Sequence, residues 1–296
     1  MISTTTSALP APAWRRLSRG LAHQPVAMLL CAAFIALTLV AAIAGDALTP
    51  FDPTFQDLGS RLLPPGTIGA EGRYWFGTDA LGRDVLSLLV VGAWPALFVS
   101  VCAVSLAAVA GIGAGILAGY RGGRFAVLLL YLSNIQLSFP FFLLAITIVG
   151  ILSPSVPLVI AVIGLGTWVR FARVTYSDTN QIRQLEYVEA VLVMRGSIWR
   201  VLFRHILPNV LPNVLVLATF AFGTAIVMES GLSFVGLGVP TDSPTWGRML
   251  SEGRDYMETA WWLTVFPGSC IFLLVLSINV LGEQVRDISD PKVNRR

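Results

Sequence analysis

The chain has 296 residues and a formal net charge of +3, and 55% of its residues are hydrophobic. Only 12% are charged, about half of the share that a soluble domain carries, and the mean hydropathy is +0.74. This composition excludes an ordinary soluble domain and predicts an all-α integral membrane protein.

The charged residues leave long stretches without Asp, Glu, Lys or Arg. These stretches are residues 20–45, 85–120, 125–169, 205–228 and 259–282. A membrane-spanning helix needs about 20 apolar residues, so four stretches hold one helix each. The run SPSVP at 153–157 divides the longest stretch with turn-forming residues. We therefore predict six transmembrane helices, near residues 26–45, 90–119, 126–151, 157–174, 209–230 and 261–282.

The fourth predicted helix differs from the others because it contains Arg170 and Arg173. We expect both side chains to snorkel to a membrane interface, so that the middle of every span is free of charge. At Pro154 and Pro157 a solvent-facing turn and a kink inside one long helix both remain open, and the count of six helices rests on the turn.

The basic residues lie unevenly on the two sides of the predicted spans. With the N-terminus inside, the outside segments hold five arginines, and the other 15 of the 20 basic residues lie inside. The positive-inside rule therefore places both termini in the cytoplasm. The predicted segments are a cytoplasmic tail 1–25, a first span 26–45, a periplasmic loop 46–86, a core 87–283 with a cytoplasmic loop 175–208 and an outer loop 231–260, and a cytoplasmic tail 284–296.

The first predicted helix has a second interpretation as a secretory signal, because arginines precede it and Ala42-Ile43-Ala44 resembles a cleavage site. Its apolar run exceeds the 7–15 residues of a signal core, so we favour an uncleaved anchor. The three cysteines fall in three different spans, which predicts packing residues rather than a disulfide framework.

The chain lacks the residues that membrane enzymes and pumps use. Its only lysine is Lys292, so it cannot form a GxxxxGK[ST] phosphate loop. It has two histidines, His23 and His205, and neither an HExxH nor a CxxC motif that would hold a catalytic metal. Glu229 falls at the outer end of its helix, away from the positions that proton relays occupy. We therefore expect no enzymatic activity, no metal and an energy source outside this chain.

A charged, helix-forming insert, EYVEAVLVMRGSIWRVLFRHILPNVLP at 186–212, separates two apolar segments. It predicts a helix at 186–194, a break at Arg195-Gly196-Ser197 with Ser197 as cap, and a second helix at 198–207. Pro208 and Pro212 are expected to separate this second helix from the next span. By physics alone, a solvated connector lying on anionic lipid remains open.

Glu189-Ala190-Val191, the turn at Gly196 and the later Leu207-Pro208 resemble the EAA loop of permease subunits in binding-protein-dependent ABC importers. Val191 departs from the second Ala of the family pattern, and Arg195 stands where Gly is usual, with Gly196 directly after it. The resemblance implies that this loop is the coupling helix seated on a partner ATPase. The implied coupling residues are Glu186, Tyr187, Glu189, Ala190, Val191, Met194, Arg195, Gly196 and Ser197.

A second motif, FGTDALGRD at 76–84, resembles the signature of the "C" type permease in the dipeptide, oligopeptide and nickel group. The segments LSFVGLG at 232–238, WG at 246–247, LSEGR at 250–254 and NVLG at 279–282 resemble the same group. The signature residues in the outer loop are Phe76, Gly77, Thr78, Asp79, Gly82, Arg83 and Asp84.

The resemblance implies the type I ABC importer permease fold in a bacterial inner membrane. It also implies a second homologous permease, two ATPase subunits that bind ATP and Mg, and a substrate-binding protein, with no cofactor in this chain. Short peptides are the expected substrate, and nickel complexes, glutathione and opine-like solutes are the alternatives. A secondary transporter without an ATPase and a purely structural anchor are the alternatives from other classes. The sequence identifies no substrate-binding residues.

Other features have simpler interpretations. Gly111, Gly115 and Gly119 have the small-xxx-small spacing of close helix packing. Asp79 and Arg83 would pair if helical, or cap a helix. Trp246, Trp261 and Trp262 predict an interfacial aromatic belt, whereas Trp168 and residues 139–142 contact either lipid and helices or the substrate path. The long loop 46–84 is expected to contact the binding protein or the partner permease.

Overall fold

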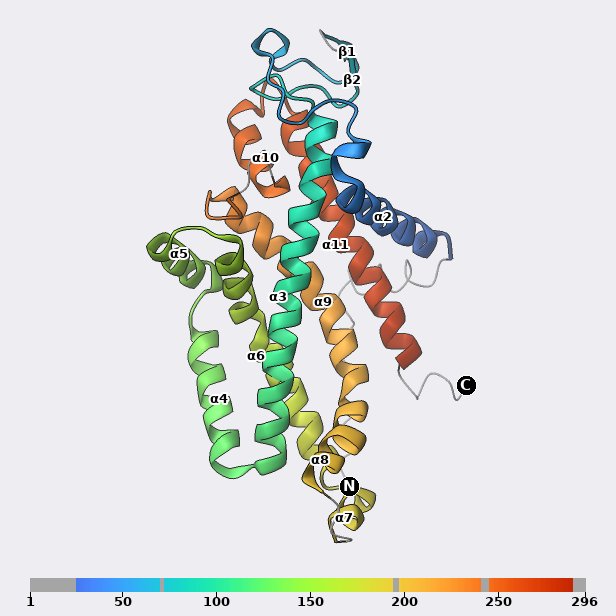
Figure 1. Ribbon diagram of the computed structural model, residues 1–296, viewed down its shortest axis with the longest axis vertical. Coiled ribbons are helices and arrows are strands. Elements are labelled where there is room, and N and C mark those ends of the chain that lie inside the picture. Colours follow the sequence, from blue (N-terminus) through green and yellow to red (C-terminus); the bar gives the residue numbers. More distant parts are fainter. Residues whose placement is uncertain (1–24, 70–71, 194–196, 241–244, 290–296) are drawn as a thin grey trace, which may run out of the picture.

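The computed structural model describes residues 25–69, 72–193, 197–240 and 245–289, and the description that follows concerns these residues. Figure 1 shows an elongated helical bundle. Five helices, counting the continuous segment Ile198–Phe234 as one, are long and apolar enough to cross a membrane, and there are six if the bent pair α4 and α5 counts as one span. The main helices are α2 (Pro25–Ala44), α3 (Val85–Arg121), α4 (Gly123–Ser138), α5 (Phe141–Leu152), α6 (Val156–Ile182), α9 (Leu207–Phe234) and α11 (Trp262–Ser289).

The shorter elements gather at the two ends of this bundle (Figure 1). One end, which we call the outer cap, comprises residues 45–69, 72–84 and 246–256. It contains η1 (Gly45–Leu48), η2 (Leu58–Ser60), the antiparallel strands β1 (Thr67–Ile68) and β2 (Arg73–Tyr74), α10 (Trp246–Gly253) and η4 (Arg254–Tyr256). The opposite end, which we call the coupling end, contains α7 (Glu186–Val193), α8 (Ile198–Arg200) and the π-helical segment η3 (Val201–Ile206).

The long helices α3 and α6 run parallel and pack closely through the glycine stripe. A Cβ on Gly111 would lie 2.5 Å from Cβ of Phe171, and one on Gly119 would lie 2.6 Å from Cβ of Thr179. Gly113, on another face of α3, has no neighbour within 4 Å. The predicted packing role of Gly111, Gly115 and Gly119 is therefore confirmed. The helices α9, α2 and α11 pack beside this pair, with Ile226 and Leu274 fully buried between them.

The third predicted span, 126–151, is wrong as a continuous helix. The axis bends by 85° between α4 and α5, and Phe139 adopts an extended conformation with φ −95° and ψ 129°. The cause is Pro140, because a proline disfavours helical geometry in the residue before it. The predicted turn before the fourth span is present at 153–155, and Ser155 caps α6 by accepting a hydrogen bond from the backbone N–H of Leu158.

The predicted separation of the insert from the fifth span is also wrong. Helix α8 continues through η3 into α9, so that residues 198–234 form one helical segment. Pro208 lies two residues after the end of the π turn η3, and a π turn is one of the local changes by which a helix accommodates a proline. The side chain of Asn209 donates to the carbonyl of His205 at 2.6 Å and satisfies it.

Three of the other spans extend beyond their predicted limits, whereas α2 matches its prediction within one residue. Helix α6 continues to Ile182 instead of ending near 174, and α3 begins at Val85 and ends at Arg121. Helix α11 reaches Ser289. Charged residues near helix ends therefore do not terminate these helices, since a helix can project beyond the hydrocarbon.

Candidate functional site

The coupling end folds back on the bundle through a small apolar contact. Val188 of α7 is fully buried, as are Val201 and Ile206 of η3, and Val191 packs against the same cluster. The rings of Tyr187 and His205 lie 6.0 Å apart. These contacts hold α7 against the start of α9.

The structure describes some of the predicted coupling residues and not others. Glu186 and Tyr187 are exposed on α7, and the backbones of Glu189 and Ala190 lie on the same helix. Met194, Arg195 and Gly196 lie outside the described residues, and with them the predicted turn. Ser197 precedes α8 in an extended conformation, but its side chain makes no capping hydrogen bond.

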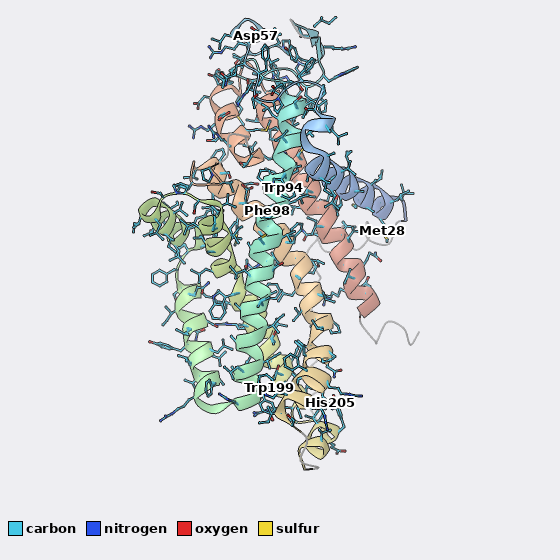
Figure 2. All side chains as sticks on the ribbon, viewed as in Figure 1. Met28, Asp57, Trp94, Phe98, Trp199 and His205 are labelled. Carbon is cyan, nitrogen blue, oxygen red and sulfur yellow. The ribbon has the colours of Figure 1, made fainter. Side chains whose placement is uncertain are left out.

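Exposed apolar side chains cover the coupling end, and we call Tyr187, Ile198, Trp199 and Phe203 the docking patch. Trp199 is 68% exposed and Phe203 is 61% exposed. Their rings stack at 5.8 Å, one helical turn apart, and Figure 2 shows Trp199 at this end of the molecule. An exposed apolar patch of this kind marks an interaction surface. The sequence analysis missed the pair, although an i, i+4 aromatic spacing within a charged helix signals it.

Two polar contacts tie the coupling end to the bundle. The guanidinium of Arg183, just after α6, donates to the backbone carbonyl of Tyr120 on α3 at 2.8 Å. The amide of Asn213 on α9 donates to Asp178 on α6 at 2.9 Å. Helices α3, α6 and α9 are thereby connected where they leave the apolar region.

The signature loop of the outer cap requires glycine at two points. Gly77 and Gly82 have φ values of 78° and 77°, a backbone region that side chains disfavour. A Cβ on Gly77 would lie 2.6 Å from the carbonyl oxygen of Leu63, and one on Gly82 would overlap the backbone of Asp57. These two residues let the loop 76–84 pack directly on residues 57–63.

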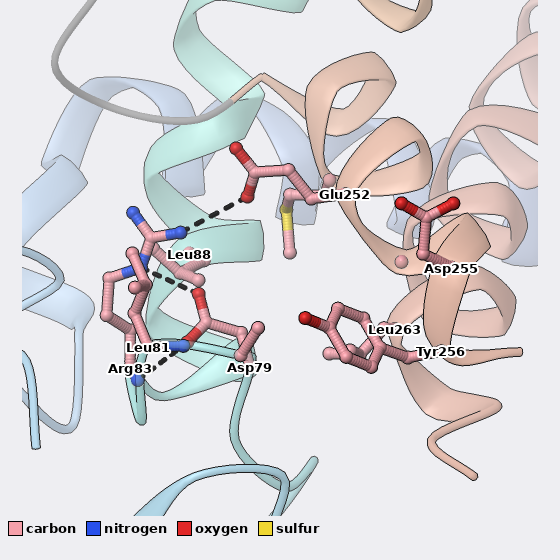
Figure 3. Close-up of a pocket in the computed structure, with 11 residues that line it drawn as sticks. Asp79, Leu81, Arg83, Leu88, Glu252, Asp255, Tyr256 and Leu263 are labelled. Atoms are coloured by element: carbon pink, nitrogen blue, oxygen red, sulfur yellow. Dashed lines mark hydrogen bonds and ion pairs between the residues drawn. The ribbon is translucent and has the colours of Figure 1, made fainter. Parts of the chain in front are cut away.

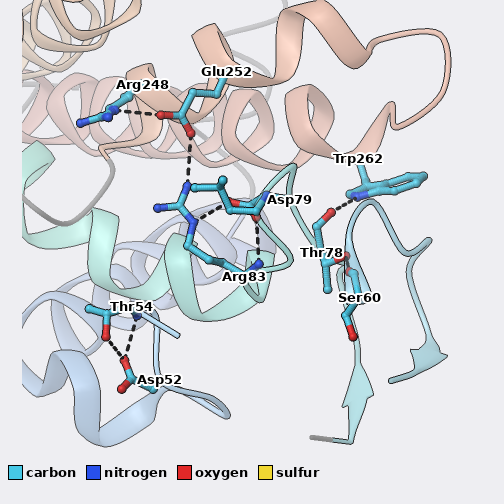
Figure 4. A network of polar contacts seen from close by, with 10 residues as sticks. Asp52, Thr54, Ser60, Thr78, Asp79, Arg83, Arg248, Glu252 and Trp262 are labelled. Carbon is cyan, nitrogen blue, oxygen red and sulfur yellow. Dashed lines mark hydrogen bonds and ion pairs between the residues drawn. The ribbon is translucent and has the colours of Figure 1, made fainter. Parts of the chain in front are cut away.

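The charged signature residues form an ion-pair network with α10 (Figures 3 and 4). Arg83 Nε donates to Asp79 Oδ2 at 2.6 Å, and Arg83 Nη2 lies 3.3 Å from Glu252 Oε2. Glu252 also pairs with Arg248 at 2.8 Å. Asp79 and Arg83 do pair, but in a loop and not in the helix on which the prediction depended, and Asp79 also accepts from the backbone N–H groups of Leu81 and Arg83.

The uncharged signature residues Thr78 and Phe76 also contact neighbouring segments. The Thr78 hydroxyl donates to the carbonyl of Ser60 at 2.6 Å and accepts from the backbone N–H of Leu63 at 2.8 Å. Phe76 stacks on Phe266 of α11 at 4.3 Å. The outer loop is thus attached to α11 as well as to α10.

Asp84 caps α3. Its Oδ2 accepts from the backbone N–H of Ser87 at 2.8 Å and from the Ser87 hydroxyl at 2.7 Å. Its Oδ1 is buried without a hydrogen-bond partner among the described residues. Burial therefore raises the pKa of Asp84 more than the hydrogen bonds from Ser87 lower it.

The predicted aromatic belt is wrong for two of its three tryptophans. Trp246 and Trp262 are buried, and each indole N–H donates to a backbone carbonyl: Trp246 to Leu89 at 2.9 Å, and Trp262 to Thr78 at 3.1 Å. Only Trp261 is half exposed. A tryptophan near a helix end fits an interface and a buried polar anchor equally well by sequence.

A cavity of about 340 Å³ lies between the signature loop and α10 (Figure 3). Asp79, Arg83, Glu252 and Tyr256 supply its polar wall, and Met249 contributes to its apolar wall. In the described part of the chain no three His, Cys, Asp or Glu side chains gather closely enough to hold a metal. The cavity therefore combines charged groups on one side with apolar side chains on the other.

Family comparisons match both parts of the chain. Residues 111–295 match the model described as the inner membrane component of binding-protein-dependent transport systems. Residues 12–65 match the N-terminal transmembrane domain of oligopeptide transport permease C.

Individual relatives match over most of their length. The chain is 37% identical to the di/tripeptide transport system permease protein DppC of Pseudomonas aeruginosa, over 88% of this chain and 86% of the relative. It is 36% identical, with the same coverage, to the probable D,D-dipeptide transport system permease protein DdpC of Escherichia coli. The glutathione transport system permease protein GsiD of Pectobacterium atrosepticum is 33% identical over 95% of this chain and 91% of its own.

Among solved structures, a chain of the MetNI methionine ABC transporter has the same fold. It aligns with a TM-score of 0.55 at 20% identity, over 69% of this chain and 97% of that chain. The chain therefore belongs to the family of inner membrane components of binding-protein-dependent transport systems, and it is a multi-pass permease subunit of an ABC importer with the type I fold in a bacterial inner membrane.

Proposed function

We propose that this permease serves an importer of short peptides. The observation that carries the proposal is the similarity, over more than 85% of both chains, to permeases named for di/tripeptide and D,D-dipeptide transport. The relative named for glutathione transport supports a second candidate, since glutathione is itself a modified tripeptide. Both candidates share a backbone amide and a free carboxylate.

The permease works as one part of a larger assembly in this proposal. A second homologous permease completes the pathway, and a substrate-binding protein delivers the peptide from outside. Two cytoplasmic ATPases bind ATP and Mg and supply the energy, and this chain has no catalytic role of its own. Closure of the ATPase pair alternates the access of the pathway between the two sides.

The docking patch supports contact with an ATPase at the coupling end. Aromatic side chains are enriched among the residues that dominate binding energy, and here Trp199 and Phe203 are already stacked in the free chain. Because Arg183 bonds the end of α3, a displacement of α7 would move α3 and α6 together.

The outer cap is proposed to receive the binding protein. Its ion pairs and buried tryptophans fix the loop 76–84 before any partner arrives, and a preorganised surface loses little entropy on binding.

The decisive experiment measures uptake of a labelled dipeptide in cells that lack this gene and in complemented cells. Unlabelled tripeptides, glutathione and a nickel salt serve as competitors. Uptake that returns on complementation and that peptides block supports a peptide importer. Equal uptake in both strains rejects peptides and leaves metal complexes or opine-like solutes.

A single charge reversal tests the coupling role. We expect Glu189→Lys on α7 to abolish uptake while the protein stays in the membrane at normal amounts, with Arg124→Gln, exposed at the turn between α3 and α4, as a control. Normal uptake at normal expression would remove Glu189 from the coupling contact.

A further inference from the structure

A two-stranded hairpin lies at the outermost part of the outer cap. Strands β1 and β2 pair Thr67 with Tyr74 and Ile68 with Arg73, and Figure 1 shows them at the end of the molecule farthest from α7 and α8. They also lie beyond the ends of α2 and α3, the two helices that the loop containing them connects. The hairpin is therefore placed to meet a partner that approaches from outside the membrane.

The inner face of the hairpin is fixed to the rest of the cap. Tyr74 is 1% exposed, and its ring lies 5.0 Å from the ring of Phe51. The backbone N–H groups of Gly66 and Gly77 both donate to the carbonyl of Tyr74, at 2.8 Å and 3.3 Å. The strands are therefore held in place before a partner arrives, so that binding costs little ordering entropy.

The outer face carries three exposed side chains, and we call Ile68, Arg73 and Trp75 the hairpin face. Ile68 is 78% exposed and Trp75 is 56% exposed. Ile68 and Arg73 lie directly opposite each other in the ladder, so their side chains project from the same face of the hairpin. The guanidinium carbon of Arg73 lies 4.5 Å from the centre of the Trp75 ring. The three side chains therefore form one surface.

The composition of the hairpin face is typical of a protein interface. Tryptophan and arginine are enriched among the residues that dominate binding energy. A guanidinium that stacks on a ring keeps its N–H groups, which lie in its own plane, free to bind a carboxylate. Ile68 and the Trp75 ring gain free energy when a partner removes them from water. The hairpin face therefore fits an apolar surface with a carboxylate at its edge.

We propose that the hairpin face is a contact through which this permease holds its substrate-binding protein, in an apolar depression with an Asp or Glu at its edge. The inference rests on the binding-protein docking proposed above for the outer cap, and not on which solute that protein carries. A soluble protein that arrives from outside reaches this end of the molecule first. Lipid headgroups fit less well, because the hairpin lies beyond the ends of α2 and α3.

The affinity for the binding protein tests the hairpin face. The complex of both permeases and the ATPases is placed in nanodiscs, and the probe is the soluble binding protein that stimulates its ATPase activity. We expect Trp75→Ala to raise the dissociation constant at least about tenfold, and Ile68→Ala about threefold, because each removes exposed apolar area from the contact.

Leu58→Ala is the matched control for these two variants. Leu58 is 71% exposed, but it follows Asp57, which Figure 2 shows on the other side of the cap from the hairpin. We expect this variant to change the dissociation constant less than about twofold.

Salt separates the role of Arg73 from that of the apolar side chains. Arg73→Gln should weaken binding about fivefold at low salt and less than about twofold at high salt, because exposed charge pairs are screened. Trp75→Ala should lose the same factor at both salt concentrations. A loss in Arg73→Gln that does not depend on salt would reject a carboxylate as the partner of Arg73.

Three results of the affinity measurement would overturn the inference in different ways. Unchanged affinity of both Trp75→Ala and Ile68→Ala, with wild type still binding, would reject the hairpin face and leave docking elsewhere on the cap. If no binding protein binds wild type, the docking proposed for the outer cap fails as well. Loss of the second permease from the purified Trp75→Ala complex would assign the hairpin face to that subunit instead.

Quenching by brominated lipids tests the bilayer as the alternative partner. The chain has eight tryptophans, and the difference between wild type and Trp75→Phe isolates the fluorescence of Trp75. We expect lipids brominated close to their headgroups to leave this component unquenched. Quenching would place Trp75 at the bilayer surface and overturn the inference.

Discussion

The outer cap and the coupling end both contain charged and aromatic residues, but the cap buries or pairs most of them whereas the coupling end exposes its aromatic side chains. In the cap, Arg83 pairs with both Asp79 and Glu252, and Trp246 and Trp262 are buried with their N–H groups bonded. At the coupling end, α8 has no buried residue. The aromatic side chains of its docking patch are exposed.

The difference indicates which end depends on another chain. The cap pairs Arg83 with Asp79 and Glu252 inside itself, so it holds its shape alone and offers a fixed surface. The coupling end leaves apolar area uncovered, which a partner must bury to gain the free energy of association. The parallel helices α3 and α6 connect the two ends as one closely packed unit.

The largest expected effect comes from removing the aromatic pair at the coupling end. Trp199→Ala with Phe203→Ala should weaken association with the ATPase subunits at least about thirtyfold, since a dominant interface residue contributes about 2 kcal/mol or more. Co-purification of the ATPases at graded concentrations measures this. Trp75→Ala, an exposed aromatic residue on the outer cap, is the control, and an unchanged affinity of the double variant would show that the patch is not the contact.

Removing an ion pair inside the cap should lower the stability of the folded protein and not its association with the ATPase subunits. Arg83→Ala leaves the buried Asp79 carboxylate without its guanidinium, so we expect a loss of about 3 kcal/mol in the free energy of unfolding. Arg248→Ala removes the exposed half of the network and should cost less than about 1 kcal/mol. Thermal unfolding of the purified complex, followed by tryptophan fluorescence, compares them. Equal shifts would mean that Glu252, and not Asp79, is the important partner.

The connection between the ends is tested at two glycines of α3. Gly115→Ala should destabilise the protein by about 2 kcal/mol, because its Cβ would lie 2.6 Å from the carbonyl oxygen of Ala172. Gly113→Ala meets open space and should be neutral or slightly stabilising, since alanine favours a helix over glycine by about 1 kcal/mol. The same unfolding assay separates the two, and similar melting temperatures would argue against close packing of α3 on α6.

The smallest effect is a pH dependence of the cap. Because burial raises the pKa of Asp84, the folded state binds this proton more tightly than the unfolded state. Stability from this group is therefore present at acidic pH and is lost as the pH rises through the raised pKa. Asp84→Asn, which caps a helix about equally well, should remove this component, so the melting temperature of wild type relative to the variant should fall with rising pH. Parallel pH profiles would contradict the shift.

Several features could be predicted because they depend on local composition. The apolar stretches, the insert before Leu207 and the glycine stripe of α3 follow from hydropathy and spacing along one helix. The structure agrees with the stripe and with the break at 153–155. Local rules failed at the prolines: Pro140 breaks a span that composition made continuous, whereas Pro208 and Pro212 do not end the segment that contains them.

By itself, the sequence determined that the chain crosses a membrane, where most spans lie and that it carries no phosphate loop, because these properties follow from residue type and order. Only the tertiary structure decided that Arg83 meets Glu252, 169 residues away, and that Arg173 meets Asn134 across two helices. It also decided which tryptophans are buried and which aromatic side chains stay exposed. The physical reason is that burial and pairing depend on which helices pack together, and residues far apart in the chain determine that packing.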